Sequence, residues 1–161
     1  MLSQFVKKLM FARQFSMEDG KIEMLGSREV MLPVNFVASF DKSIYAQAKK
    51  ASVGMLQKLA KKLGLKGPTL MNTAIQIYDS YGLGKMIIKT MNGSKSALVE
   101  VKESPIVAEL RMRGEKPKAP ACFLTAGVLA GTMSVILSKD MDAKEIRCAA
   151  KGDGVCQFEV R

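Results

Sequence analysis

Near the end of the chain, residues 145–160 read EIRCAAKGDGVCQFEV. The Lys-Gly-Asp-Gly run at 151–154 is typical of a turn, and the apolar residues on either side predict a hairpin with strands at 145–150 and 155–160. Residues opposite one another in a hairpin share a face of the sheet. Cys148 and Cys156 are opposite only in a loop of three or five residues centred on Gly152, so such a loop is predicted. The inward face then carries Ile146, Cys148, Ala150, Cys156, Phe158 and Val160.

The segment before this hairpin, residues 119–138, contains no charged residue. Pro120 suits the first turn of a helix, which predicts a buried helix over 120–138. Its length just reaches that of a membrane span, but its many Ala, Gly, Ser and Thr residues favour burial within the protein. Gly127 and Gly131 lie four residues apart and allow another backbone to approach closely. That backbone could belong to the same chain or to a second copy across a dimer interface.

The upstream sequence alternates between helical and hairpin patterns. Apolar periodicity predicts helices over 2–13, 45–63 and 67–81, and Asp19-Gly20 and Asn92-Gly93 predict hairpin turns. Residues 30–40 are ambiguous, 106–110 are predicted as a third strand beside the second hairpin, and 114–120 as a linker. The order predicts an α+β fold, an antiparallel β-sheet packed with helices, in a single domain over residues 1–161.

The composition bounds the function. The chain of 161 residues has a net charge of +10, yet its two halves are both basic and no run of five like charges occurs. The basic helix over 45–63 is therefore interpreted as a solvated face, and neither nucleic-acid binding nor a membrane span is expected. Lys7, Lys8 and Arg13 interrupt the apolar N-terminus, unlike in a secretory signal. With three cysteines, an odd number, this predicts a cytoplasmic protein with reduced thiols.

All three cysteines, Cys122, Cys148 and Cys156, fall in the last quarter of the chain. Zinc binds thiolate, imidazole and carboxylate groups, and because the chain has no histidine, a fourth ligand must be a carboxylate or water. Glu145, three residues before Cys148, is the candidate. The positive end of the 120–138 helix favours a thiolate at Cys122. Spacing alone leaves two interpretations open, a closed structural metal site or three buried inert cysteines, because no Cys-x-x-Cys pair is present.

The segments 122–131, 145–148 and 152–160 together resemble the 4-vinyl reductase (hydrocarbon-binding) domain family. Its pattern is a Cys or His that opens a small-residue helix, then Glu-x-x-Cys, then Gly-x-x-x-Cys-x-Phe, and each position is filled here. The resemblance implies a fold similar to the ligand-binding domains of nitric-oxide signalling and of a Golgi-transport subunit, often dimeric. It also implies a zinc-binding part over 120–161, with structural zinc held by Cys122, Glu145, Cys148 and Cys156.

The resemblance implies a function as well. In aromatic-responsive transcription activators, the family's domain senses phenolic or hydrocarbon effectors in an apolar pocket beside the zinc. We therefore expect a sensory or regulatory module that binds a small apolar or aromatic ligand, forms a homodimer and signals to a separate partner. Phe123, Tyr78 and Tyr81 are candidate pocket residues, although each also fits a plain core position.

Two other functions stay open at this point, an accessory role in tetrapyrrole vinyl-group reduction and a role as an assembly subunit. The sequence disfavours direct catalysis, because it has no histidine and no complete dinucleotide-binding glycine motif. A reductase needs a cofactor that carries the hydride.

Overall fold

The computed structural model describes residues 3–93 and 95–161. It divides the chain into two compact units, one ending at Pro33 and the other spanning Val34–Arg161. The prediction that residues 1–161 act as a single binding domain stays a prediction.

The first unit consists of a helix and a three-stranded antiparallel sheet in the order β1-β2-β3. Its elements are α1 (Gln4–Phe11), β1 (Phe15–Glu18), β2 (Lys21–Met24) and β3 (Ser27–Glu29). The side chain of Ser3 caps α1 by accepting a hydrogen bond from the Val6 amide. Asp19 and Gly20 both have positive φ, the conformation that a tight hairpin turn requires, and the predicted hairpin is confirmed. Leu2, included in the predicted 2–13 helix, lies outside the described residues.

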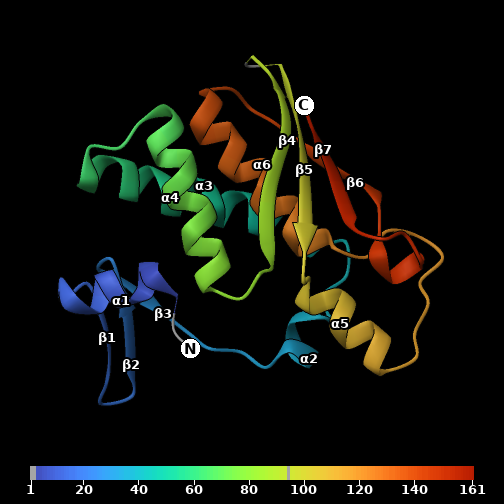
Figure 1. Cartoon of the computed structure of the whole chain (residues 1–161), viewed down its shortest axis with the longest axis horizontal. Helices are drawn as coiled ribbons and strands as arrows, with labels where there is room; N and C mark the ends of the chain where they lie inside the picture. The colour runs from blue at the N-terminus through green and yellow to red at the C-terminus, as the bar shows by residue number, and fades with distance from the viewer. Residues whose placement is uncertain (1–2, 94) are drawn as a thin grey trace. The chain divides into compact units, whose positions relative to one another are not determined.

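The second unit combines helices with a four-stranded antiparallel sheet in the order β4-β5-β7-β6 (Figure 1). The helices are α2 (Val34–Val37), α3 (Ile44–Leu63), α4 (Gly67–Ser80), α5 (Pro105–Met112) and α6 (Phe123–Leu137). The strands are β4 (Lys85–Asn92), β5 (Ser96–Lys102), β6 (Ala143–Arg147) and β7 (Cys156–Val160), with a short 3-10 helix η1 (Ala149–Lys151) between the last two. The predicted α+β fold with an antiparallel sheet is confirmed.

The prediction of a strand over 106–110 is wrong, because these residues belong to α5. The hydroxyl of Ser104 accepts a hydrogen bond from the Val107 amide, and Pro105 occupies the first turn. Both features start a helix. The partner of β5 in the sheet is instead β7, which comes from the end of the chain.

The long uncharged segment forms α6, which begins at Phe123 rather than at residue 120. A Cβ atom at Gly127 would collide with the carbonyl oxygen of Tyr45, and one at Gly131 with that of Lys49. The small residues of α6 therefore allow close packing against α3 within the chain, the first of the two alternatives. Between these helices and α4, Ser52, Tyr78 and Thr132 form a buried hydrogen-bonded network.

On its other side, α6 contacts β6 and β7, so it forms the centre of this unit. Across residues 3–93 and 95–161, no helix combines the length and the apolar character needed to cross a membrane.

Candidate metal centre and adjoining pocket

The β6–β7 hairpin has the predicted centre but a longer connection. Arg147 pairs with Gln157, a register centred on residue 152 as expected. Eight residues, 148–155, separate the strands, so the predicted loop of three or five residues is wrong. The Cys148 amide donates to Asp153 Oδ2 at 2.8 Å, and η1 ends at Gly152 with φ 111°. This side-chain bond and the 3-10 turn lead the chain out of the ladder earlier than a tight turn would.

A β-bulge at Ile146 brings the glutamate and the cysteine of the Glu-x-x-Cys motif to one side. In a regular strand, residues three apart point to opposite faces of the sheet. Here the register shifts between Glu145 and Arg147, so Ile146 is the extra residue. Ile146 is 48% exposed, which corrects its predicted inward position, whereas Glu145 is only 6% exposed. The bulge therefore turns Glu145 into the interior beside Cys148.

Cys122 occupies the N-cap position of α6, one residue before the helix rather than in its first turn. Its backbone amide donates a hydrogen bond of 3.0 Å to Glu145 Oε2. This bond connects the start of α6 to the bulged strand. The positive end of α6 also favours negative charge at this position.

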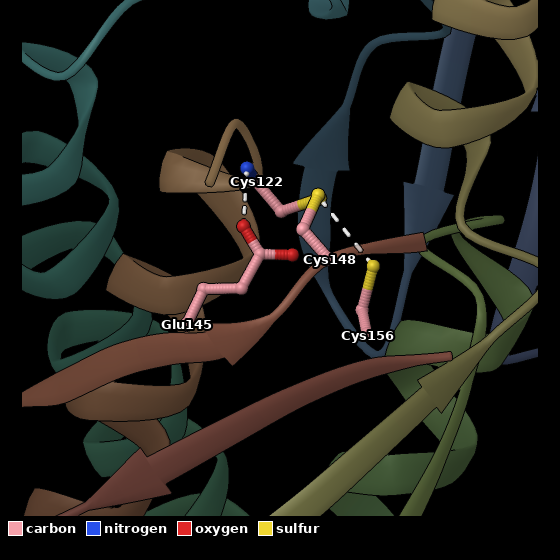
Figure 2. A group of neighbouring side chains, drawn as sticks. All are labelled: Cys122, Glu145, Cys148 and Cys156. Atoms are coloured by element: carbon pink, nitrogen blue, oxygen red, sulfur yellow. Dashed lines mark hydrogen bonds between the residues drawn. The ribbon is translucent and has the colours of Figure 1, made fainter. Parts of the chain in front are cut away.

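The four predicted ligands converge in the structure (Figure 2). Cys122, Glu145, Cys148 and Cys156 are all buried, and their ligand atoms lie within 4.8 Å of one another. The Sγ atoms of Cys122 and Cys156 are 3.8 Å apart. Tetrahedral zinc with bonds of about 2.3 Å to sulfur separates two thiolates by about 3.8 Å. The cluster can therefore hold a metal ion, and its size suits a tetrahedral one.

One oxygen of this cluster has an unusual environment. Glu145 Oε1 is buried and, within the described residues, accepts no hydrogen bond. A buried acceptor without a donor is costly, which makes such atoms rare in folded proteins. A cation at the centre of the cluster would satisfy this oxygen, so the donor set fits a bound metal.

The titration of the cluster leads to the same fit. Hydrogen bonds from Cys122 and Cys156 hold the pKa of the Cys148 thiol far below its usual range. The contact with Cys148 raises the pKa of Cys122, and burial raises the pKa of the Glu145 carboxyl. The three thiols thus share one negative charge, and a divalent cation would favour ionisation of all four groups.

A pocket of about 270 Å³ adjoins the cluster. Cys122 and Glu145 form part of its wall, and two aromatic side chains, Tyr45 and Phe123, form another part. The remaining lining residues are Ala119, Pro120, Ala126, Ala143 and Lys144. The pocket is therefore mostly apolar and shares two residues with the metal cluster.

Of the three predicted pocket residues, Phe123 lines this pocket. Tyr78 is buried in the hydrogen-bonded network between α3, α4 and α6, and Tyr81 caps the end of α4 with 37% of its surface exposed. Their rings contact each other edge to face, with centroids 6.4 Å apart. Neither belongs to the lining of the pocket beside the cluster.

Sequence reasoning missed Tyr45 as a pocket residue. Its hydroxyl donates to Asp142 Oδ1 at 3.0 Å and accepts from the Ala143 amide at 2.9 Å. Lys49 Nζ lies 2.7 Å from the same Asp142 oxygen, and this hydrogen bond holds the pKa of Asp142 below its usual range. Tyr45 is thus fixed against the start of β6. Tyr45 and Asp142 are far apart in the sequence, so no local pattern indicates the contact.

The comparisons with known proteins can now be stated. Residues 98–161 match the model of the 4-vinyl reductase domain family. The predicted resemblance to this family is therefore confirmed over this range. The matched segment runs from β5 to the end of the chain and contains all four residues of the metal cluster.

Individual proteins resemble the chain over different lengths. MJ0745 of Methanocaldococcus jannaschii is 44% identical over 41 residues, which is 26% of this chain and 23% of that protein. The phenol-responsive sensory domain of the transcription activator PoxR, solved with phenol, superposes with a TM-score of 0.77 at 17% identity, covering 99% of this chain and 90% of that one. A vinyl-4-reductase family protein from M. jannaschii gives a TM-score of 0.53 at 18% identity over 83% of both chains. These likenesses confirm the fold.

Proposed function

We propose that this protein is a zinc-containing module that binds a small aromatic or hydrocarbon ligand and has a sensory or regulatory role. The observation that carries the proposal is the pocket that shares Cys122 and Glu145 with the metal cluster. Ligand sites are typically concave and apolar with a few polar groups, as this pocket is. The phenol-bound PoxR domain, which has a similar fold, supports this function.

The size of the pocket bears on the alternatives. Its volume of about 270 Å³ lies just below the ~300–1,000 Å³ of typical ligand pockets. A single aromatic ring suits this space, whereas a tetrapyrrole has four rings and a macrocycle. The pocket therefore favours a small aromatic or aliphatic ligand over an accessory role in tetrapyrrole reduction.

Zinc is the metal that we propose for the cluster. Three thiolates and one carboxylate are ligands that zinc prefers, and a site filled by four protein ligands has a structural role. Cys122 belongs to the start of α6 and the other three residues to the β6–β7 hairpin. The metal would therefore fasten the central helix to the hairpin. Ligand contacts with Cys122 or Glu145 would reach both elements, and a homodimer and a separate partner would carry the signal further.

A binding experiment tests the proposal. We expect isothermal titration and native mass spectrometry to detect one single-ring ligand, such as a phenol, per chain. Ala119→Trp should fill the mouth of the pocket and abolish binding, because Ala119 is exposed and lines it. Ala46→Trp, at an exposed α3 position outside the lining, is the matched control. If folded, metal-loaded protein bound no phenol, simple aromatic or hydrocarbon from a panel, the proposed function would be wrong.

A further inference from the structure

The positive charge of the protein is concentrated in one segment. Residues 42–78 contain no Asp or Glu and seven lysines, which supply +7 of the net +10. These lysines are Lys42, Lys49, Lys50, Lys58, Lys61, Lys62 and Lys66. Most of them belong to α3. The distribution by halves of the chain concealed this concentration.

The two faces of α3 differ in character. Ala48, Ser52, Leu56 and Leu59 are buried on the inward face. Helical geometry places Gln47, Lys50, Gly54, Lys58 and Lys61 on the opposite face, which we call the outward face of α3. Its lysines and Gln47 are exposed. Lys49 lies elsewhere, because it pairs with Asp140 and Asp142.

Gly54 lies at the centre of the outward face. Glycine within a helix is destabilising relative to alanine, so it calls for a reason. At Gly127 and Gly131 the reason is the backbone of α3, which leaves no room for a Cβ atom. A Cβ atom at Gly54 would meet nothing within 4 Å among the described residues. The packing of this chain therefore does not explain Gly54, whereas the close approach of a partner would.

We infer that the outward face of α3 binds the phosphate backbone of double-stranded nucleic acid without reading its sequence. Lysine and glutamine side chains are common phosphate contacts, and Lys supplies a point charge rather than a fork that reads bases. A helix that lies on a membrane needs large apolar side chains on the same surface, and the outward face has none. This inference replaces the composition-based expectation of a solvated face and does not depend on the small-ligand proposal.

Binding of the full chain to a mixed-sequence DNA duplex of about 20 base pairs, measured by fluorescence anisotropy, tests the inference. We expect binding at about 50 mM salt that weakens linearly in log–log form as salt rises. Reversal of three charges in K50E/K58E/K61E should lower the affinity at least about tenfold and reduce the salt slope by about 3, since each phosphate contact contributes ~0.9. The matched variant K85E/K102E/K116E changes the net charge equally at exposed positions elsewhere and should retain most of the affinity.

A second variant separates binding from folding. Gly54→Leu adds bulk with a good helix former, so it should raise the melting temperature while it weakens DNA binding severalfold. The inference would be overturned by an absence of binding at about 50 mM salt, by equal losses in both triple variants, or by unchanged affinity of Gly54→Leu. Equal or tighter binding of the outward face to phosphatidylserine vesicles or to an acidic protein would overturn it as well.

Discussion

The metal cluster and the pocket share Cys122 and Glu145, yet they are built in different ways. All four cluster residues lie within the last 40 residues, and a bulge, an N-cap and one hairpin bring them together. The opposite wall of the pocket comes from α3, where Tyr45 is fixed by Asp142, 97 residues away. A local arrangement of this kind can serve stability, whereas a wall borrowed from a distant helix can move and can be tuned for binding. Changes on the two sides should therefore have separable effects.

The largest effect should come from breaking the cluster. Cys148→Ser should reduce bound zinc well below one per chain and, because a metal fastens α6 to the hairpin, destabilise the protein by about 4 kcal/mol. That loss corresponds to a fall in melting temperature of about 8–16 °C, measurable by calorimetry, with zinc counted by mass spectrometry. Ile146→Ala, in the exposed bulge, is the control and should change neither value much. Zinc far below one per chain in wild-type protein purified without chelators would contradict the prediction.

A smaller loss of stability should follow from pushing the pocket wall away. Gly127→Ala places a methyl group against the carbonyl of Tyr45, so α3 must shift. We expect a cost of about 1–3 kcal/mol, as for other overpacked sites, and weaker ligand binding with zinc still at one per chain. Gly54→Ala is the matched control, because its methyl group meets open space. Loss of zinc in Gly127→Ala would show that the two sides are not separable.

The sharpest local test of the pocket is Tyr45→Phe. It removes the hydroxyl that accepts from the Ala143 amide and donates to Asp142. The lost bonds should cost about 1–2 kcal/mol and lower ligand affinity severalfold, with the metal content unchanged. Thermal unfolding and titration with the same ligand measure both effects. Tyr81→Phe, at a residue outside the pocket, should leave ligand affinity unaltered.

The same contrast explains what the sequence could predict. The four cluster residues follow from short spacings, but the loop length does not, because it depends on the Asp153 side chain and on η1. The strand predicted over 106–110 is wrong because a five-residue apolar run fits strand and helix equally, and Ser104-Pro105, a helix start, was overlooked. Tyr45 and Gly127 acquire their roles only from packing between α3 and α6, which periodicity alone does not reveal.

The smallest effect should be the pH dependence of the contact that holds Tyr45. The pKa of Asp142 is lowered from 3.8, first by its bond to Lys49 and then by that to Tyr45. A lowered pKa means that the stabilisation is complete above the unfolded value and is lost as the pH falls through the folded one. Asp142→Asn should therefore cost a few tenths to about 1 kcal/mol at pH 7, since the carboxylate is largely exposed, and nearly nothing below about pH 3. Denaturant unfolding of both proteins at the two pH values measures the difference, in which any common loss of metal at low pH cancels. A cost that persisted unchanged at low pH would show that Asp142 fixes the pocket wall by geometry rather than by charge.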